Sequence, residues 1–183
     1  MKYPFLLFFL TCSVLFGNAK FDMLKLYREK NYVNACHLGR DHYIHYTKDE
    51  EFITLYAFSC LYADYIDRLA VPISALKYTK EARANAAYFA TVLMQKKLLY
   101  HALVDQYNIY GLSMPATSYI LSKVFNLYTQ TADVAPSNGV YSFVDTDNQH
   151  ITYKLFLEKH ADIDKMVIEV FRDTILQERH VYW

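Results

Sequence analysis

The chain has 183 residues, of which 54% are hydrophobic, and its 19 Lys and Arg are balanced by 19 Asp and Glu. This balance, without any block of like charge, argues against a basic nucleic-acid surface and against a polybasic membrane patch. The apolar fraction is ample for a folded core, which argues against a disordered chain. Only four Gly and four Pro are present, so long helices are favoured over a sandwich of many short strands.

The first 19 residues have the pattern of a cleavable secretory signal peptide. Lys2 precedes an apolar run over residues 5–16, and small residues follow at Gly17 and Ala19. This run is shorter than the roughly 20 residues that span a bilayer, so an uncleaved membrane anchor is the weaker alternative. We expect cleavage near Ala19 and a periplasmic or secreted mature chain, residues 20–183, without an integral membrane span.

The expected mature chain keeps two cysteines, Cys36 and Cys60. An even pair in an oxidising compartment favours a disulfide. Cysteine is also a common small residue of hydrophobic cores, so two buried free thiols are the alternative.

From residue 21 to residue 130 the apolar residues recur at helical spacing, with few breaks. Asn31 is a plausible N-cap for a second helix, and Pro72 suits the first turn of a fourth. The predicted helices cover residues 21–30, 31–46, 52–66, a segment from 72, 81–106 and 113–128.

The last third of the chain changes its pattern. Residues 131–139 are a loop by composition, and two alternating runs between 140 and 157 around a polar turn predict a β-hairpin. Residues 162–179 carry one apolar stripe at helical spacing, which predicts a final helix. The expected fold is therefore a single, mainly α domain of antiparallel helix pairs, with a C-terminal hairpin and a packed terminal helix.

A weak internal repeat is present in the first helices. Leu-Tyr followed eight residues later by Ala occurs twice, as Leu26-Tyr27 with Ala35 and as Leu61-Tyr62 with Ala70. Over residues 21–80 this pattern resembles the tetratricopeptide class of helical repeats, which implies stacked helix pairs with a concave binding face. The Trp and Gly of the family's first helix are missing and Pro72 falls early, so a generic helical bundle is the alternative.

The strongest candidate for metal chemistry is a set of three side chains at i, i+4 and i+8. His37, Asp41 and His45 fall on one face of the predicted second helix, and such ligands suit zinc or copper. They extend over about 12 Å of helix, so one ion needs a ligand from another element. A solvated helix face is the alternative reading, and no cofactor is implied.

A second candidate follows the third helix. Asp64, Asp67 and Arg68 lie close together in the sequence, and two carboxylates can act as an acid and base pair. The alternative is a helix cap or a surface ion pair, worth less than about 1 kcal/mol. No Gly-x-Ser-x-Gly, His-Glu-x-x-His or Cys-x-x-Cys motif is present, so an enzyme is the less favoured class.

The sequence therefore favours an exported, non-enzymatic interaction or assembly protein that holds a protein or peptide partner in the cell envelope. Tyr27, Tyr56 and Tyr62 lie on the segments that would line a concave face. Tyr27 and Tyr62 occupy the repeated position and are expected to pack, which leaves Tyr56 as the better surface candidate. The alternative is a periplasmic metal-binding protein or enzyme that uses the face of His37, Asp41 and His45.

Overall fold

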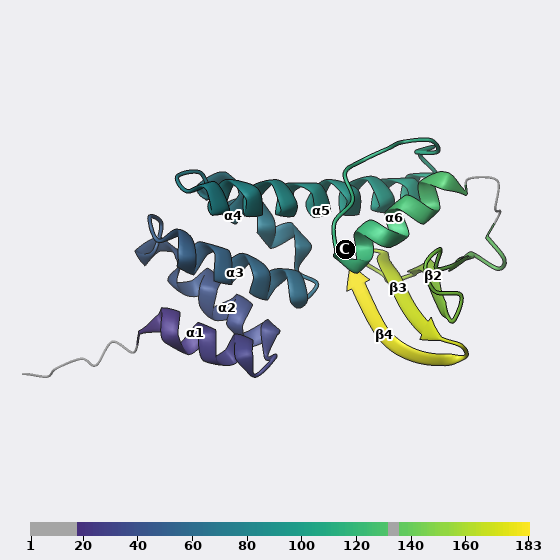
Figure 1. Ribbon diagram of the computed structural model, residues 1–183. Coiled ribbons are helices and arrows are strands. Elements are labelled where there is room, and N and C mark those ends of the chain that lie inside the picture. The colour runs from purple at the N-terminus through teal and green to yellow at the C-terminus, as the bar shows by residue number, and fades with distance from the viewer. Residues whose placement is uncertain (1–17, 132–135) are drawn as a thin grey trace, which may run out of the picture.

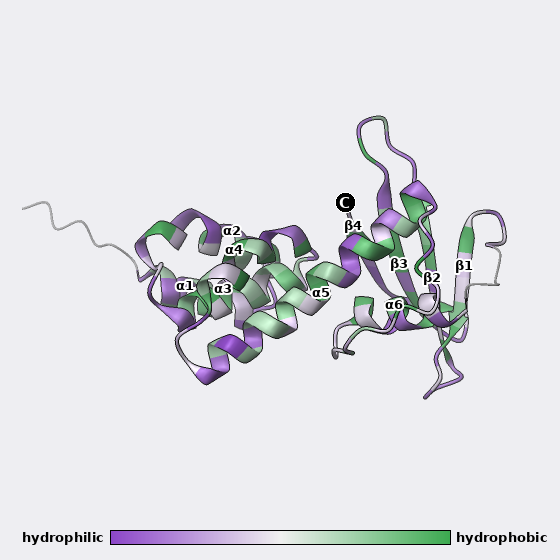
Figure 2. Ribbon diagram, turned by 90° about the horizontal axis from the view of Figure 1, so that it is seen from above, coloured by the Kyte–Doolittle hydropathy of each residue, from purple (hydrophilic) through white to green (hydrophobic). Residues whose placement is uncertain are grey.

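The computed structural model describes residues 18–131 and 136–183, so the predicted signal peptide lies outside the described residues except for Asn18 and Ala19. Two halves lie side by side, as Figures 1 and 2 show. One is a stack of short helices, and the other is an antiparallel sheet with one covering helix. A single long helix, α5, runs along both halves and connects them.

Six α-helices and two 3-10 helices are found in the described part of the chain. They are α1 (Ala19–Arg28), α2 (Tyr32–His42), η1 (Tyr43–His45), α3 (Glu50–Tyr62), η2 (Ile66–Leu69), α4 (Ala70–Ala75), α5 (Lys80–Asp105) and α6 (Ile120–Gln130). Helix was predicted in the right places up to residue 106, although the helix predicted at 31–46 ends in the 3-10 turn η1 and the one predicted at 52–66 already ends at Tyr62. The helix predicted at 113–128 begins later than expected, at Ile120.

The first helix of each helix pair begins with the same kind of side-chain N-cap. Asn18, Asp49 and Thr79 are the N-caps of α1, α3 and α5, and each side chain accepts a hydrogen bond from a backbone N–H three residues further on. Such caps satisfy donors that the helix itself leaves free. The helical half is therefore a series of units that start alike, at intervals of about 30 residues.

The turns that close α1 and α3 are also alike. Lys30 and Asp64 adopt left-handed backbone angles, with φ of 59° and 61°. The next amide in each turn donates back across the helix end, from Asn31 to the Leu26 carbonyl and from Tyr65 to the Cys60 carbonyl, both at 2.9 Å. Counted from these turns, Leu26 corresponds to Cys60 and not to Leu61, so the repeat seen in the sequence is one residue out of register.

The C-terminal part is a four-stranded antiparallel sheet, which corrects the predicted fold class from mainly α to mixed α and β. The strands are β1 (Val140–Val144), β2 (Ile151–Glu158), β3 (Lys165–Arg172) and β4 (Ile175–Tyr182), in the order β1-β2-β3-β4. The predicted hairpin of β1 and β2 is confirmed. The final helix predicted at 162–179 is wrong, because these residues form β3 and β4.

Packing on both faces explains why β3 is a strand. Met166 and Ile168 face the helices, while Val167 on the opposite face is also buried under side chains of neighbouring strands. A strand covered on both sides reads as a near-continuous apolar run instead of a clean alternation. At the end of this run Asp173 has a φ of 54°, and the chain turns back tightly into β4.

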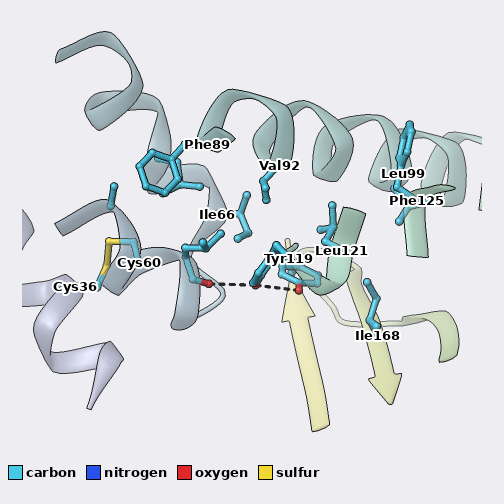
Figure 3. Close-up of a cluster of buried hydrophobic side chains, with 14 of the residues drawn as sticks. Cys36, Cys60, Ile66, Phe89, Val92, Leu99, Tyr119, Leu121, Phe125 and Ile168 are labelled. Carbon is cyan, nitrogen blue, oxygen red and sulfur yellow. Dashed lines mark hydrogen bonds between the residues drawn. A yellow bond between two sulfur atoms is a disulfide. The ribbon is translucent and has the colours of Figure 1, made fainter. Parts of the chain in front are cut away.

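One hydrophobic core extends through both halves. Phe89 and Val92 of α5 cover the short helices, whereas Leu99 of the same helix packs with α6 and the sheet (Figure 3). All three side chains are fully buried. No helix of the described segments is long and apolar enough to cross a membrane.

Candidate functional site

The clearest surface feature is a row of aromatic side chains across α1, α3 and α5. Tyr27 and Tyr62 have ring centroids 6.1 Å apart, Phe58 lies 6.3 Å from Tyr62, and Tyr88 lies 6.2 Å from Phe58. Tyr32 of α2 extends the row, 5.1 Å from Tyr62. Tyr62 is 46% exposed, so this ladder of rings is open to solvent along part of its length.

The aromatic row opens into a cavity of about 560 Å³ between the first helices of successive units. Tyr27 and Phe58 form part of its wall, and every charged residue that lines it is a glutamate: Glu50, Glu51 and Glu81. We call this cavity, with the ring row of Tyr27, Phe58, Tyr62 and Tyr88, the aromatic groove.

The charge at the acidic end of the groove is held in place by backbone donors. The carboxylate of Glu50 accepts hydrogen bonds from the backbone amides of Lys77, Tyr78 and Thr79 at 2.7 to 2.9 Å. Partial desolvation raises the pKa of Glu50, but these donors together lower it to about 2. Glu50 therefore remains ionised, and it fixes the loop before α5 against the start of α3.

Tyr56, the tyrosine predicted to be on the surface, is buried instead. Only 3% of it is exposed, and its ring covers Gly39 of α2 so closely that a Cβ atom on Gly39 would lie 2.4 Å from the ring. Helix α3 is central, and Tyr56 points toward α2 while Tyr62 points outward with Tyr27. The expected roles of Tyr56 and Tyr62 are reversed, because Tyr62 is exposed and Tyr56 belongs to the core, whereas Tyr27 is partly buried against the core.

The two cysteines of the expected mature chain form a disulfide in the structure, between α2 and α3. Their Cα atoms are 4.7 Å apart, and both residues are fully buried (Figure 3). The bridge lies one turn from Tyr56 along α3, so both features hold the same pair of helices together.

The predicted metal ligands are not brought together. Helix α2 ends at His42, so His45 lies on η1 and does not continue the helix face of His37. The ring of His37 stacks on Tyr65 at 5.7 Å, and Asp41 pairs with Arg40 at 2.7 Å. Within residues 18–131 and 136–183, no three His, Cys, Asp or Glu side chains are placed to hold one ion.

The turn after α3 forms a polar junction between the two halves. Asp64 accepts a hydrogen bond from the Tyr119 hydroxyl at 2.7 Å and lies 2.8 Å from Nδ1 of His180 in β4. The Tyr182 hydroxyl is 3.2 Å from that of Tyr119. Burial lowers the pKa of His180, but the hydrogen bond and charge of Asp64 outweigh it and the pKa is raised. The sequence had indicated Asp64, but not its partners.

Comparisons with known proteins give no relative from which a role can be transferred. No protein-family model matches the chain, and neither the curated proteins nor the solved structures contain a match. The function must therefore be argued from the geometry of the chain itself.

Proposed function

We propose that this chain is an interaction protein that binds a basic segment of a partner protein in the aromatic groove. The observation that carries the proposal is the open row of rings that leads into a cavity whose charged lining is entirely acidic. Tyr62 is exposed and the other rings of the row are partly exposed, and contiguous aromatic surface of this kind marks interaction sites.

The chemistry of the groove favours Lys and Arg in the bound segment. Glu51 is paired with Lys20 at 2.7 Å, which leaves Glu50 and Glu81 as the groove carboxylates without a cationic partner among the described residues. These carboxylates attract a cationic segment and disfavour an acidic one, and they make the affinity depend on ionic strength. Tyrosine faces add cation–π attraction of about 0.5 to 1 kcal/mol at exposed positions. The apolar stems of Lys and Arg can lie along the rings at the same time.

The groove is also rigid where it needs to be. The disulfide between Cys36 and Cys60 holds α2 against α3, and Glu50 fixes the start of α5 against α3. A surface that is already ordered loses little conformational entropy on binding. Tyrosine side chains have few rotatable bonds, so their own entropy loss on binding is also small.

The test uses two fluorescent peptides, one that alternates Lys with Leu and one with Glu in place of each Lys. We expect the basic peptide to bind. The Tyr62→Ala substitution should lower the affinity for this peptide at least tenfold, a loss of about 1.4 kcal/mol in binding free energy. The matched control is Tyr110→Ala, which removes a tyrosine that is 58% exposed and does not line the groove. Fluorescence anisotropy at two salt concentrations measures the affinities.

The charge of the groove is tested separately by Glu81→Gln. This change should lower the affinity for the basic peptide a few-fold at low salt. It should have little effect at high salt, because screening reduces the contribution of exposed charges. Equal binding of both peptides, or equal weakening by Tyr62→Ala and Tyr110→Ala, would refute the groove proposal.

We further propose that the chain acts outside the cytoplasm, after cleavage near Ala19. The support is the N-terminal pattern and the disulfide, which persists in oxidising compartments. Cleavage would remove Asn18, whose side chain accepts from the Phe21 amide at 3.4 Å, and cost about 1 kcal/mol. The intact mass of the purified protein tests the proposal, since that mass should correspond to a chain that begins at Lys20. A mass that includes Met1 would refute the proposal.

A further inference from the structure

A second cavity, of about 240 Å³, lies where the turn after α3 meets α5 and the end of β4. It shares no lining residue with the aromatic groove. Two aromatic rings form part of its wall, those of Tyr65 and Trp183, with centroids 6.3 Å apart and planes at 76°. Two cationic side chains, Arg68 and Lys96, also line it.

Arg68 is the unusual residue in this cavity. Its guanidinium carbon lies over the Tyr65 ring, 4.3 Å from the centroid, and Nη1 donates a weak hydrogen bond to Sγ of Cys36 at 3.4 Å. In the part of the chain that the structure describes, no carboxylate lies within the 4.0 Å of an ion pair with Arg68. A guanidinium has five N–H donors, so most of this planar fork has no acceptor among residues 18–131 and 136–183.

Lys96 adds positive charge to the cavity but no free donor. Its side chain is only 3% exposed, and Nζ donates to both carboxylate oxygens of Asp67 and to the backbone carbonyl of Trp183. Asp67 is shared with Lys97 at 2.9 Å, so one carboxylate faces two ammonium groups.

The two acidic residues of the lining each have partners of their own. Asp64 lies 2.8 Å from Nδ1 of His180 on β4, and Asp67 pairs with Lys96 and Lys97. Of the two cationic side chains in the lining, Arg68 is therefore the one without a carboxylate partner among the described residues.

We infer that this cavity binds a small molecule with one carboxylate and one flat ring. The carboxylate accepts two parallel hydrogen bonds from the Arg68 fork, which is the geometry that guanidinium and carboxylate groups prefer. The ring of the ligand packs against Trp183 and against the edge of Tyr65, since His37 and Arg68 already lie over the Tyr65 ring. A volume of about 240 Å³ is below that of sites for drug-sized ligands, so it suits a molecule with a single ring.

Trp183 makes the proposal directly measurable, because it is the only tryptophan in the chain. We expect benzoate, added at constant ionic strength, to change the tryptophan fluorescence along a saturable curve. Inorganic phosphate at the same concentrations should give no saturable change, since it cannot occupy the aromatic walls. The Arg68→Gln variant should weaken benzoate binding at least tenfold.

The matched control is Arg83→Gln. Arg83 donates to the backbone carbonyls of Lys77 and Tyr78 and does not line the cavity, so its loss should leave the benzoate curve unchanged. Arg68→Lys keeps the charge without the fork and serves as the second variant if Arg68→Gln lowers the melting temperature. A benzoate response of the wild-type protein that is linear and does not saturate overturns the inference, as does equal saturation by phosphate.

Discussion

The helical half and the sheet half of this molecule are organised by interactions of different range. In the helical half, the N-caps join residues three apart and the turns after α1 and α3 join residues five apart. In the sheet half, order comes from pairings such as Ile168 with His180 and Leu155 with Ile168, which are set by the turns and by burial. Local sequence patterns therefore describe the first half well and the second half poorly.

The failed prediction of a final helix shows the limit of such patterns. The apolar residues at 163, 166, 167, 170 and 171 fit a helical stripe, yet those from 166 onward lie on the two faces of β3, and Ile163 precedes the strand and is exposed. Periodicity cannot separate a fully buried strand from a helix over so few residues. The enrichment in Val, Ile and Phe was the signal that favoured a strand.

The largest expected effect lies in the helical half, at Tyr56. Tyr56→Ala should lower the free energy of unfolding by about 3 to 5 kcal/mol, because it leaves a cavity over Gly39 between α2 and α3. Tyr62→Ala should cost less than about 1 kcal/mol, since Tyr62 is 46% exposed and lies at the edge of the core. Urea denaturation measures both, and similar losses for the two variants would contradict the reversed roles.

Loss of the disulfide should have the next largest effect. Replacing Cys36 and Cys60 together by Ser should lower the free energy of unfolding by about 3 kcal/mol, because the bridge restricts the unfolded chain. The untreated protein should show no reactive thiol from these two residues under denaturing, non-reducing conditions. Two reactive thiols per mature chain would mean that α2 and α3 are held by packing alone.

The junction between the halves should give a smaller effect that depends on pH. Asp64→Asn, which tolerates the left-handed backbone angle, should cost about 2 kcal/mol at pH 6, because it removes the charged partner of His180. The pKa of His180 is raised above its usual 6.5, so the stabilisation is fully present below pH 6.5 and is lost as the pH rises through the folded-state pKa.

The difference in stability between the wild-type protein and Asp64→Asn should therefore narrow from pH 6 to pH 9. Denaturation at several pH values measures this difference, and Asp67→Asn is the matched control because Asp67 pairs with lysines only. A difference that is constant with pH would show that His180 does not contribute through its charge.

The smallest expected effect on stability comes from a substitution at Asp173, and it distinguishes the observed strands from the predicted helix. Asp173 has a φ of 54° in the turn between β3 and β4. Asp173→Gly should therefore be neutral or stabilise the protein by a few tenths of a kcal/mol, roughly, because glycine adopts this angle without strain. In the middle of a helix the same change would destabilise by about 0.5 kcal/mol. The thermal midpoint distinguishes the two.

Part of the candidate site could have been predicted from the sequence. A bridge between Cys36 and Cys60 places Gly39 and Tyr56, each about one turn away, opposite one another. Had the bridge been assumed, Tyr56 would have been assigned to the interface of α2 and α3, and Tyr62 to the exposed face. The meeting of Glu81 with Glu50 and Glu51 had no such signal, because it depends on the packing of α5 against the start of α3.

The amino-acid sequence alone determined the position of the helices up to residue 106, the β1–β2 hairpin and the candidate disulfide pair, because these depend on local spacing, caps and residue type. Tertiary structure alone determined that residues 165–182 are strands, that Tyr56 is buried, and that Arg68, Lys96 and Trp183 line one cavity. These features depend on which surfaces are covered by distant parts of the chain, and hydrophobic burial has no direction that a local pattern can encode.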